Sequence, residues 1–138
     1  MNKVMAFGTF DLLHEGHKYY LKKCRGCGDY LIAIVARDST TVNVKGRKPL
    51  QNQKKRLQQV QALPFVDNAV LGQEGDKWKI IEEHKPDILC LGYDQKYFTE
   101  NLEEGLKQRG LQVRVVRIKP HQPEIYKTSK LREREHNI

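Results

Sequence analysis

Short apolar runs alternate with helix-like stretches along the whole chain, and this alternation limits the possible folds more than any other feature. A strand followed by a helix and then by another strand is the repeating unit of a parallel sheet covered by helices. The runs are rich in β-branched residues, as is typical of strands buried on both sides. The predicted strands are residues 3–7, 30–36, 68–71, 88–91 and 113–118.

Helix-like stretches with terminating residues fill the gaps between these strands. Gly26 and Gly28 end the first stretch, Pro86 follows the third and Gly110 ends the fourth; glycine and proline commonly terminate helices. The predicted helices are residues 17–25, 51–63, 77–84, 102–109 and 129–135. The sequence therefore predicts an α/β fold, a single Rossmann-like, doubly wound, parallel five-stranded sheet with helices on both faces.

The length and composition favour a small soluble domain. A chain of 138 residues buries one core, so we expect one domain over residues 1–138. Hydrophobic residues make up 38% and charged residues 30%, as in soluble globular proteins. No apolar run approaches the roughly 18 residues of a membrane span, and the amino terminus lacks the features of a signal peptide. We expect a cytoplasmic protein without a membrane partner.

The three cysteines do not form a recognisable disulfide or metal pattern. Cys24 and Cys27 form a C-x-x-C pair, but Cys90 stands alone in an apolar run, so a second ligand pair for zinc is missing. The pair also ends a helix, whereas a thioredoxin-like redox pair begins one. We interpret both residues as ordinary thiols.

The first strand runs into a glycine-flanked segment that carries two histidines. Residues 8–17 read G-T-F-D-L-L-H-E-G-H, and an amphipathic helical stretch follows. A turn that ends at a helix start presents backbone N–H groups and the positive end of the helix dipole, which favour phosphate. His14 and His17 are three residues apart, so both imidazoles can face one phosphate pocket and donate hydrogen bonds there.

This segment resembles the signature of the cytidylyltransferase-like nucleotidyltransferases. Its first four residues are similar to glycerol-3-phosphate cytidylyltransferases and to archaeal-type FAD synthetases, and the resemblance extends along nearly the whole chain. Glu15 departs from the proline or bulky apolar residue usual in the family. The resemblance implies that nucleotide is bound by Gly8, Thr9, Phe10, His14, Gly16 and His17.

Two connections are long and polar, residues 37–50 and 119–127, and both leave the carboxyl ends of strands, where such folds bind ligands. The first contains the basic run K-G-R-K over residues 45–48. A basic loop neutralises charge in phosphoryl transfer, although a solvated charge run would look the same. The resemblance favours a substrate-binding lysine here, with Lys45 and Lys48 as catalytic candidates. It also implies that Arg56, which alone would be read as a surface cation, points toward phosphate.

Two further segments are candidates for nucleotide contacts. Gly92 allows close backbone approach after the fourth strand, and Asp94 can accept hydrogen bonds or cap a helix; the resemblance implies a nucleotide contact. Residues 126–130 read Y-K-T-S-K, where hydroxyls at a helix start beside lysines suit a phosphate. This form looks closer to archaeal FAD synthetases than to glycerol-3-phosphate cytidylyltransferases. The candidate residues are Tyr126, Lys127, Thr128 and Ser129.

The inferred reaction is attack by an acceptor phosphate on the α-phosphorus of a nucleoside triphosphate, with release of pyrophosphate. The acceptor is already an anion at neutral pH, so catalysis needs positioning and charge stabilisation and no general base. The sequence shows no carboxylate cluster for a protein-held metal, so we expect Mg²⁺ to enter with the nucleotide. The resemblance favours ATP with FMN, giving FAD, over CTP with glycerol 3-phosphate or another phosphorylated acceptor.

The formal net charge of +8 indicates anionic partners without naming them. A nucleic-acid-binding domain is a minor alternative, because aromatic residues are only 8% of the chain and none interleaves the basic runs as a stacking platform requires. Small relatives often form dimers, so the resemblance also allows a homodimer.

Overall fold

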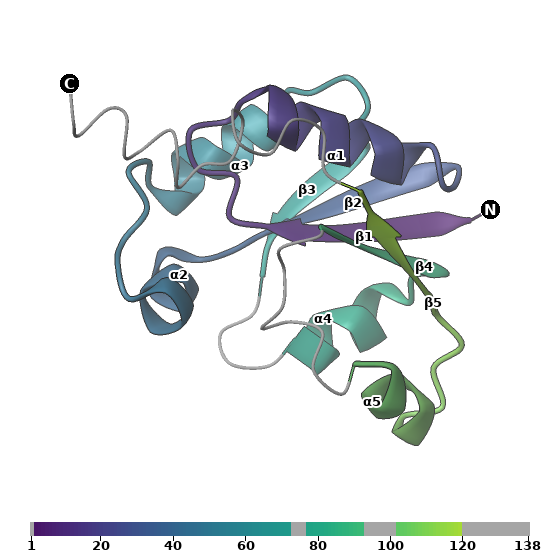
Figure 1. Ribbon diagram of the computed structural model, residues 1–138. Helices are drawn as coiled ribbons and strands as arrows, with labels where there is room; N and C mark the ends of the chain where they lie inside the picture. The colour runs from purple at the N-terminus through teal and green to yellow at the C-terminus, as the bar shows by residue number, and fades with distance from the viewer. Residues whose placement is uncertain (1, 73–76, 93–101, 120–138) are drawn as a thin grey trace.

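The computed structural model describes residues 2–72, 77–92 and 102–119, which form five strands and five helices in the order β1 α1 β2 α2 α3 β3 α4 β4 α5 β5 (Figure 1). The strands are β1 (Lys3–Gly8), β2 (Tyr30–Val35), β3 (Asn68–Leu71), β4 (Ile88–Gly92) and β5 (Arg114–Ile118). The helices are α1 (Glu15–Arg25), α2 (Asp38–Lys45), α3 (Gln53–Gln61), α4 (Lys77–His84) and α5 (Leu102–Gln108).

All five strands are parallel and lie in the order β3-β2-β1-β4-β5, which confirms the predicted Rossmann-like sheet. Helices α1 and α3 cover one face, and α4 and α5 cover the other (Figure 1). The chain builds outward from β1 to β3 and then crosses back to place β4 on the other side of β1. The order of connection therefore reverses between β1 and β4, where folds of this kind form a ligand crevice.

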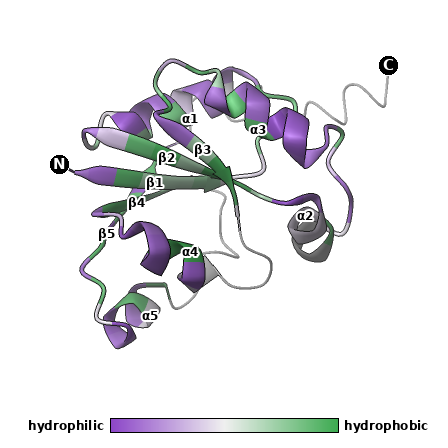
Figure 2. Ribbon diagram, turned by 180° about the vertical axis from the view of Figure 1, so that it is seen from behind, coloured by the Kyte–Doolittle hydropathy of each residue, from purple (hydrophilic) through white to green (hydrophobic). Residues whose placement is uncertain are grey.

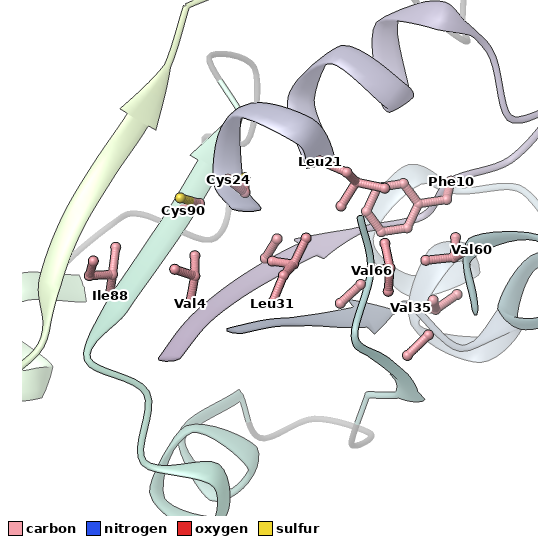
Figure 3. Close-up of a cluster of buried hydrophobic side chains, with 13 residues drawn as sticks. Val4, Phe10, Leu21, Cys24, Leu31, Val35, Val60, Val66, Ile88 and Cys90 are labelled. Atoms are coloured by element: carbon pink, nitrogen blue, oxygen red, sulfur yellow. The ribbon is translucent and has the colours of Figure 1, made fainter. Parts of the chain in front are cut away.

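Each face of the sheet contributes a separate hydrophobic core. The core under α1 and α3 includes Phe10, Leu21, Leu31 and Val60 (Figure 3), and the other core packs Ile80, Ile81, Leu102 and Leu106 over the opposite face. In Figure 2 the strands are mainly apolar, and they lie between helices that carry both apolar and polar residues. The lack of alternation within the strands follows from this double coverage. In the described part of the chain, no helix is long and apolar enough to cross a membrane.

The connection 37–50, predicted as a loop, contains the helix α2, so this prediction was wrong. The hydrophobic pattern of Asp38–Lys45 is weak, which hid the helix from periodicity. Gly46 ends it in a left-handed conformation (φ 77°), and its N–H donates to the Val42 carbonyl. Helix α2 lies at the carboxyl end of the sheet, apart from both helical layers (Figure 1). The predicted helix 129–135 lies outside the described residues.

Cys90 stands alone in the sequence, but in the structure it lies beside another cysteine. Cys24 on α1 and Cys90 on β4 are both fully buried in the core under α1, side by side in Figure 3, and Cys27 packs against the same core. All three thiols are free. Burial raises the pKa of the Cys24 and Cys27 thiols, so both are protonated at neutral pH. Cys24 packs as an apolar group, and Cys27 is a partly exposed thiol.

Candidate functional site

The histidine segment lies at the carboxyl end of β1, where the strand order reverses. Strand β1 ends at Gly8, the chain turns through residues 9–14, and α1 begins at Glu15. The helix starts two residues earlier than predicted because His14 is its N-cap, with extended backbone angles and a side chain that accepts a hydrogen bond from the Gly16 N–H. Both candidate histidines therefore belong to the first turn of α1, at the positive end of its dipole.

The two imidazoles form a reciprocal capping box. His14 Nδ1 accepts from the Gly16 N–H at 3.0 Å, and His17 Nδ1 accepts from the His14 N–H at 3.3 Å. The rings stack with their centroids 3.9 Å apart and 27° between their planes. The structure thus brings together the two residues that the sequence paired.

These hydrogen bonds define the tautomers. A neutral imidazole carries one proton, and both Nδ1 atoms act as acceptors, so the proton of each neutral ring is on Nε2. Burial lowers the pKa of His14 to about 4, with the neighbouring Glu15 carboxylate opposing the shift. His14 is therefore neutral at physiological pH, with Nε2–H as its donor. The arrangement provides directed N–H donors beside a helix N-terminus, which is suited to an anionic oxygen.

Phe10 forms the wall behind His17. Its ring meets the His17 ring edge-on at 5.7 Å, and its backbone adopts a left-handed conformation with φ 57°. Gly8 makes room for this ring, because a Cβ atom there would lie 2.6 Å from Phe10 Cζ. In this structure, the space beside Gly8, a residue that the resemblance assigned to nucleotide binding, is filled by a phenyl ring of the same loop.

The basic run is fastened to the histidine loop by a buried carboxylate. Asp11 is 2% exposed, and its two oxygens accept from the Leu50 N–H at 2.7 Å and the Gln51 N–H at 2.9 Å. Gln51 reciprocates, since its Oε1 accepts from the Leu12 N–H at 3.2 Å. Lys48 is exposed two residues before this tie, so the segment that carries it is held next to the loop that carries His14.

Arg56 holds loops together from the interior. Its side chain is fully buried and ion-paired with Asp38 at 2.7 Å. It also donates to the carbonyls of Gln51, Thr9 and Ala36 at 2.7–2.9 Å. The reading of Arg56 as a surface cation was wrong, and the guanidinium that was expected to point toward phosphate is engaged with protein groups. Burial with several partners is the reason, and we assign Arg56 to positioning the loops after β1 and β2.

The remaining predicted residues divide into two groups. Thr9 lies in the β1–α1 loop, Gly16 in the first turn of α1, Lys45 at the end of α2 and Gly92 at the end of β4. Asp94 and residues 126–129, for which the sequence predicted nucleotide contacts, lie outside the described residues. Strands β1 and β4 are adjacent and parallel, so Gly92 ends at the same edge of the sheet as Gly8.

Sequence reasoning missed three residues that build this site: Asp11, Gln51 and Tyr20. Asp11 lies inside the motif, but the backbone N–H groups that it binds are about 40 residues away in the sequence. The residues around Asp11 therefore gave no indication of its role. Tyr20 is one helical turn after His17, and this spacing places both on one side of α1, a signal that was available. No group of three or more acidic, histidine or cysteine side chains suited to a metal occurs within residues 2–72, 77–92 and 102–119.

Comparison with known proteins identifies a family. A model of the cytidylyltransferase-like family matches residues 5–134. The chain is 49% identical over 118 residues to the FAD synthase of Methanosarcina barkeri, covering 86% of this chain and 84% of that protein. It is 42% identical over 134 residues to the FAD synthase of Thermoplasma volcanium, covering 97% and 94%.

Two solved structures are similar to this chain in fold. A Thermoplasma volcanium protein described as a lipopolysaccharide core biosynthesis protein superposes with a TM-score of 0.84 at 45% identity, covering 88% of this chain and 99% of that one. Thermotoga maritima TmcAL, bound with alpha-thio ATP, shares the fold with a TM-score of 0.71 at 14% identity, covering 99% of this chain and 51% of that one. The histidine motif, the sheet order and the family match together show that this chain belongs to the cytidylyltransferase-like family of nucleotidyltransferases.

Proposed function

We propose that the protein is an FAD synthase, which transfers AMP from ATP to FMN and releases pyrophosphate. The observation that carries this proposal is the identity of 42–49% to FAD synthases over most of both chains. The histidine pair at the start of α1 supports nucleotidyl transfer, because it offers directed donors for a phosphate beside a helix N-terminus.

The proposed mechanism uses positioning and charge. The FMN phosphate attacks the α-phosphorus of ATP, the bond to the β-phosphate oxygen breaks, and pyrophosphate leaves. The acceptor phosphate is an anion at neutral pH, so no residue has to remove a proton. The Nε2–H groups of His14 and His17 would donate to the α-phosphate oxygens as charge develops on them. The capping box holds both rings before substrate arrives, so little reorganisation is needed.

The basic run would contact the leaving phosphates. Lys48 is exposed on the segment that Asp11 fastens to the histidine loop, so its ammonium can approach the triphosphate without a large movement of the chain. Lys45, Asp94 and residues 126–129 remain proposed contacts on the resemblance alone. Mg²⁺ entering with ATP would neutralise charge on the triphosphate.

The proposal is tested by pyrophosphate release in the presence of Mg²⁺, with ATP or CTP each paired with FMN or glycerol 3-phosphate. We expect turnover with ATP and FMN and at least tenfold less in the other three pairs. Turnover confined to CTP and glycerol 3-phosphate would replace this function with cytidylyl transfer. A folded protein that shows no turnover with any of the four pairs would exclude both FMN and glycerol 3-phosphate as acceptors.

A variant that preserves the helix cap keeps this test specific to the imidazole. Glutamine is an ordinary residue at the third position of a capping box, so His17→Gln retains an acceptor for the His14 N–H while removing the ring. We expect the variant to fold normally and to lose turnover about 100-fold, the usual cost of one transition-state donor.

A further inference from the structure

The pairing of β1 with β4 ends before either strand does. Their pairing runs from Val4 with Ile88 to Ala6 with Cys90 and stops there. Each strand continues with its other neighbour, since β1 pairs with β2 as far as Gly8 with Val35 and β4 pairs with β5 as far as Gly92 with Ile118. The last two residues of β1 and of β4 therefore do not pair with one another at the carboxyl edge, where β1 leads into the histidine loop.

The hydroxyl of Tyr20 contacts both strands where this pairing stops. It donates to the Cys90 carbonyl at 2.8 Å, and it lies 3.3 Å from the Phe7 carbonyl as a second, weaker acceptor. These two carbonyls belong to β4 and β1, at the register where the ladder stops. Burial raises the pKa of Tyr20 well above its usual value, so the group is a neutral O–H donor at any physiological pH.

The ring of Tyr20 packs against Phe10, beside the histidine pair. It stacks on Phe10 with the centroids 6.4 Å apart and 28° between the planes, and Phe10 in turn meets His17 edge-on. Tyr20 follows His17 by one turn of α1, so a single helix carries the imidazole and the residue that supports it. One side chain thus contacts β1, β4 and the aromatic wall.

From this geometry we propose that Tyr20 is a positioning residue: its hydroxyl fixes the spacing of the ends of β1 and β4 where the nucleotide is proposed to bind, and its ring fixes Phe10 behind His17. The inference rests on the proposed function, because it assumes that nucleotide binds at these strand ends. Tyr20 touches no reacting atom in this account. It acts through the loop after β1 and through the end of β4 at Gly92.

A variant that lacks only the hydroxyl separates the contribution of the Tyr20 hydroxyl from that of the Tyr20 ring. Tyr20→Phe keeps the ring against Phe10 but takes the donor away from the Cys90 and Phe7 carbonyls, and a buried acceptor that loses its donor is costly. The strand ends would then shift toward other partners, and their spacing would change. A shift of about 1 Å in a site of this kind is enough to lower the rate about 100-fold.

The experiment measures ATP affinity by calorimetry and kcat and KM for FAD formation in Tyr20→Phe and two controls. Tyr19→Phe makes the same chemical change one residue away on α1, where the ring faces the Lys23 ammonium at 5.6 Å. Ile81→Val removes one methyl group from the core on the opposite face and matches a general loss of stability. Thermal unfolding of all three variants confirms that each is folded at the assay temperature.

We expect Tyr20→Phe to weaken ATP binding at least fivefold and to lower kcat/KM at least tenfold, with both controls within twofold of the wild type. Values for Tyr20→Phe within twofold of the wild type would overturn the inference, and so would an equal loss in Ile81→Val, which would reduce the effect to stability. A wild type that binds ATP but forms no FAD would refute the proposed function alone, and the affinity comparison would still decide the role of Tyr20.

Discussion

His14 and His17 cap the helix that carries them, with the imidazole rings stacked at 3.9 Å and each Nδ1 accepting a backbone N–H of the first turn. Serine, asparagine and aspartate are the preferred residues at an N-cap, and glutamate or glutamine at the third helical position. Capping alone therefore does not explain two histidines at these positions. Their distinctive property is a ring that accepts through one nitrogen and donates through the other.

This relationship predicts that stability and activity separate. The double variant His14→Asn with His17→Gln replaces both rings with ordinary capping residues, so we expect the free energy of unfolding to stay within about 1 kcal/mol of the wild type, the usual value of a cap. Activity should fall at least 1,000-fold because two donors are lost. Urea unfolding and steady-state kinetics on one preparation measure both quantities. Retained activity would show that the rings serve only the helix.

The lowered pKa of His14 predicts a pH dependence of stability. Burial lowers this pKa to about 4 in the folded protein, whereas the unfolded chain titrates near about 6.5. As the pH falls from about 6.5 toward 4, the unfolded chain gains a proton that the folded protein does not, so the free energy of unfolding decreases. We expect the wild type to lose more stability between pH 7 and pH 5 than His14→Asn. Equal losses would contradict the assigned protonation state.

Asp11 predicts a combined effect on folding and substrate binding. Asparagine at this position leaves one carbonyl oxygen where two acceptors are needed and points an N–H₂ group at a backbone donor. We expect Asp11→Asn to lower the free energy of unfolding by about 2 kcal/mol and to raise KM for ATP severalfold, because the Lys48 segment loosens.

Asp29 provides the control for this variant. Its carboxylate accepts the Asn2 N–H at the exposed amino-terminal end of β1, away from the histidine loop. We expect Asp29→Asn to leave KM unchanged. An equal rise in KM in both variants would show that the Asp11 tie has no specific connection with the site.

The buried guanidinium of Arg56 predicts a large loss of stability on conservative substitution. Lysine keeps the charge but cannot reach the Asp38 carboxylate and three carbonyls from one position. We expect Arg56→Lys to cost about 3 kcal/mol, whereas Arg25→Lys, in the pair with Asp67 whose side chains are 36% and 33% exposed, should cost less than about 1 kcal/mol. Chemical denaturation compares the two, and similar costs would exclude the positioning role of Arg56.

Thiol accessibility tests the position of α1 on the sheet. Cys24 and Cys90 are fully buried, while Cys27 keeps partial exposure. We expect one thiol per folded chain to react with a disulfide reagent at pH 8, and all three after denaturation. Cys27→Ser should abolish the native reaction. Rapid native labelling of that variant would contradict the packing of α1 against β4.

The regular part of this fold was predictable from the sequence because packing and local pattern agree there. Strands β1, β2 and β4 are buried over most of their length and consist mainly of apolar residues. The limits of Lys77–His84 and Asn68–Leu71 were predicted as observed. Helix α2 was missed because eight residues with a weak apolar pattern leave periodicity little to detect.

At the site, the local sequence pattern predicted the positions of the histidines, but it did not predict the contacts between residues that are far apart in the sequence. The spacing of His14 and His17 reports a shared helix turn, which the structure shows. By contrast, Arg56 contacts Thr9 and Ala36 at separations of 47 and 20 residues, and nothing in its own helix distinguishes it from the neighbouring cations. Buried contacts between loops depend on the tertiary fold. The residues that make them are present in the sequence, but the sequence alone does not indicate that they connect loops.

The most direct measurement is the formation of FAD from FMN and ATP labelled in the α-phosphate, followed chromatographically in the wild type and in His17→Gln. The account predicts that the label appears in FAD in step with pyrophosphate release in the wild type, and that His17→Gln, although folded, is at least 100-fold slower. Equal rates in the two proteins, or label that never enters FAD while the wild type turns over ATP, would contradict it.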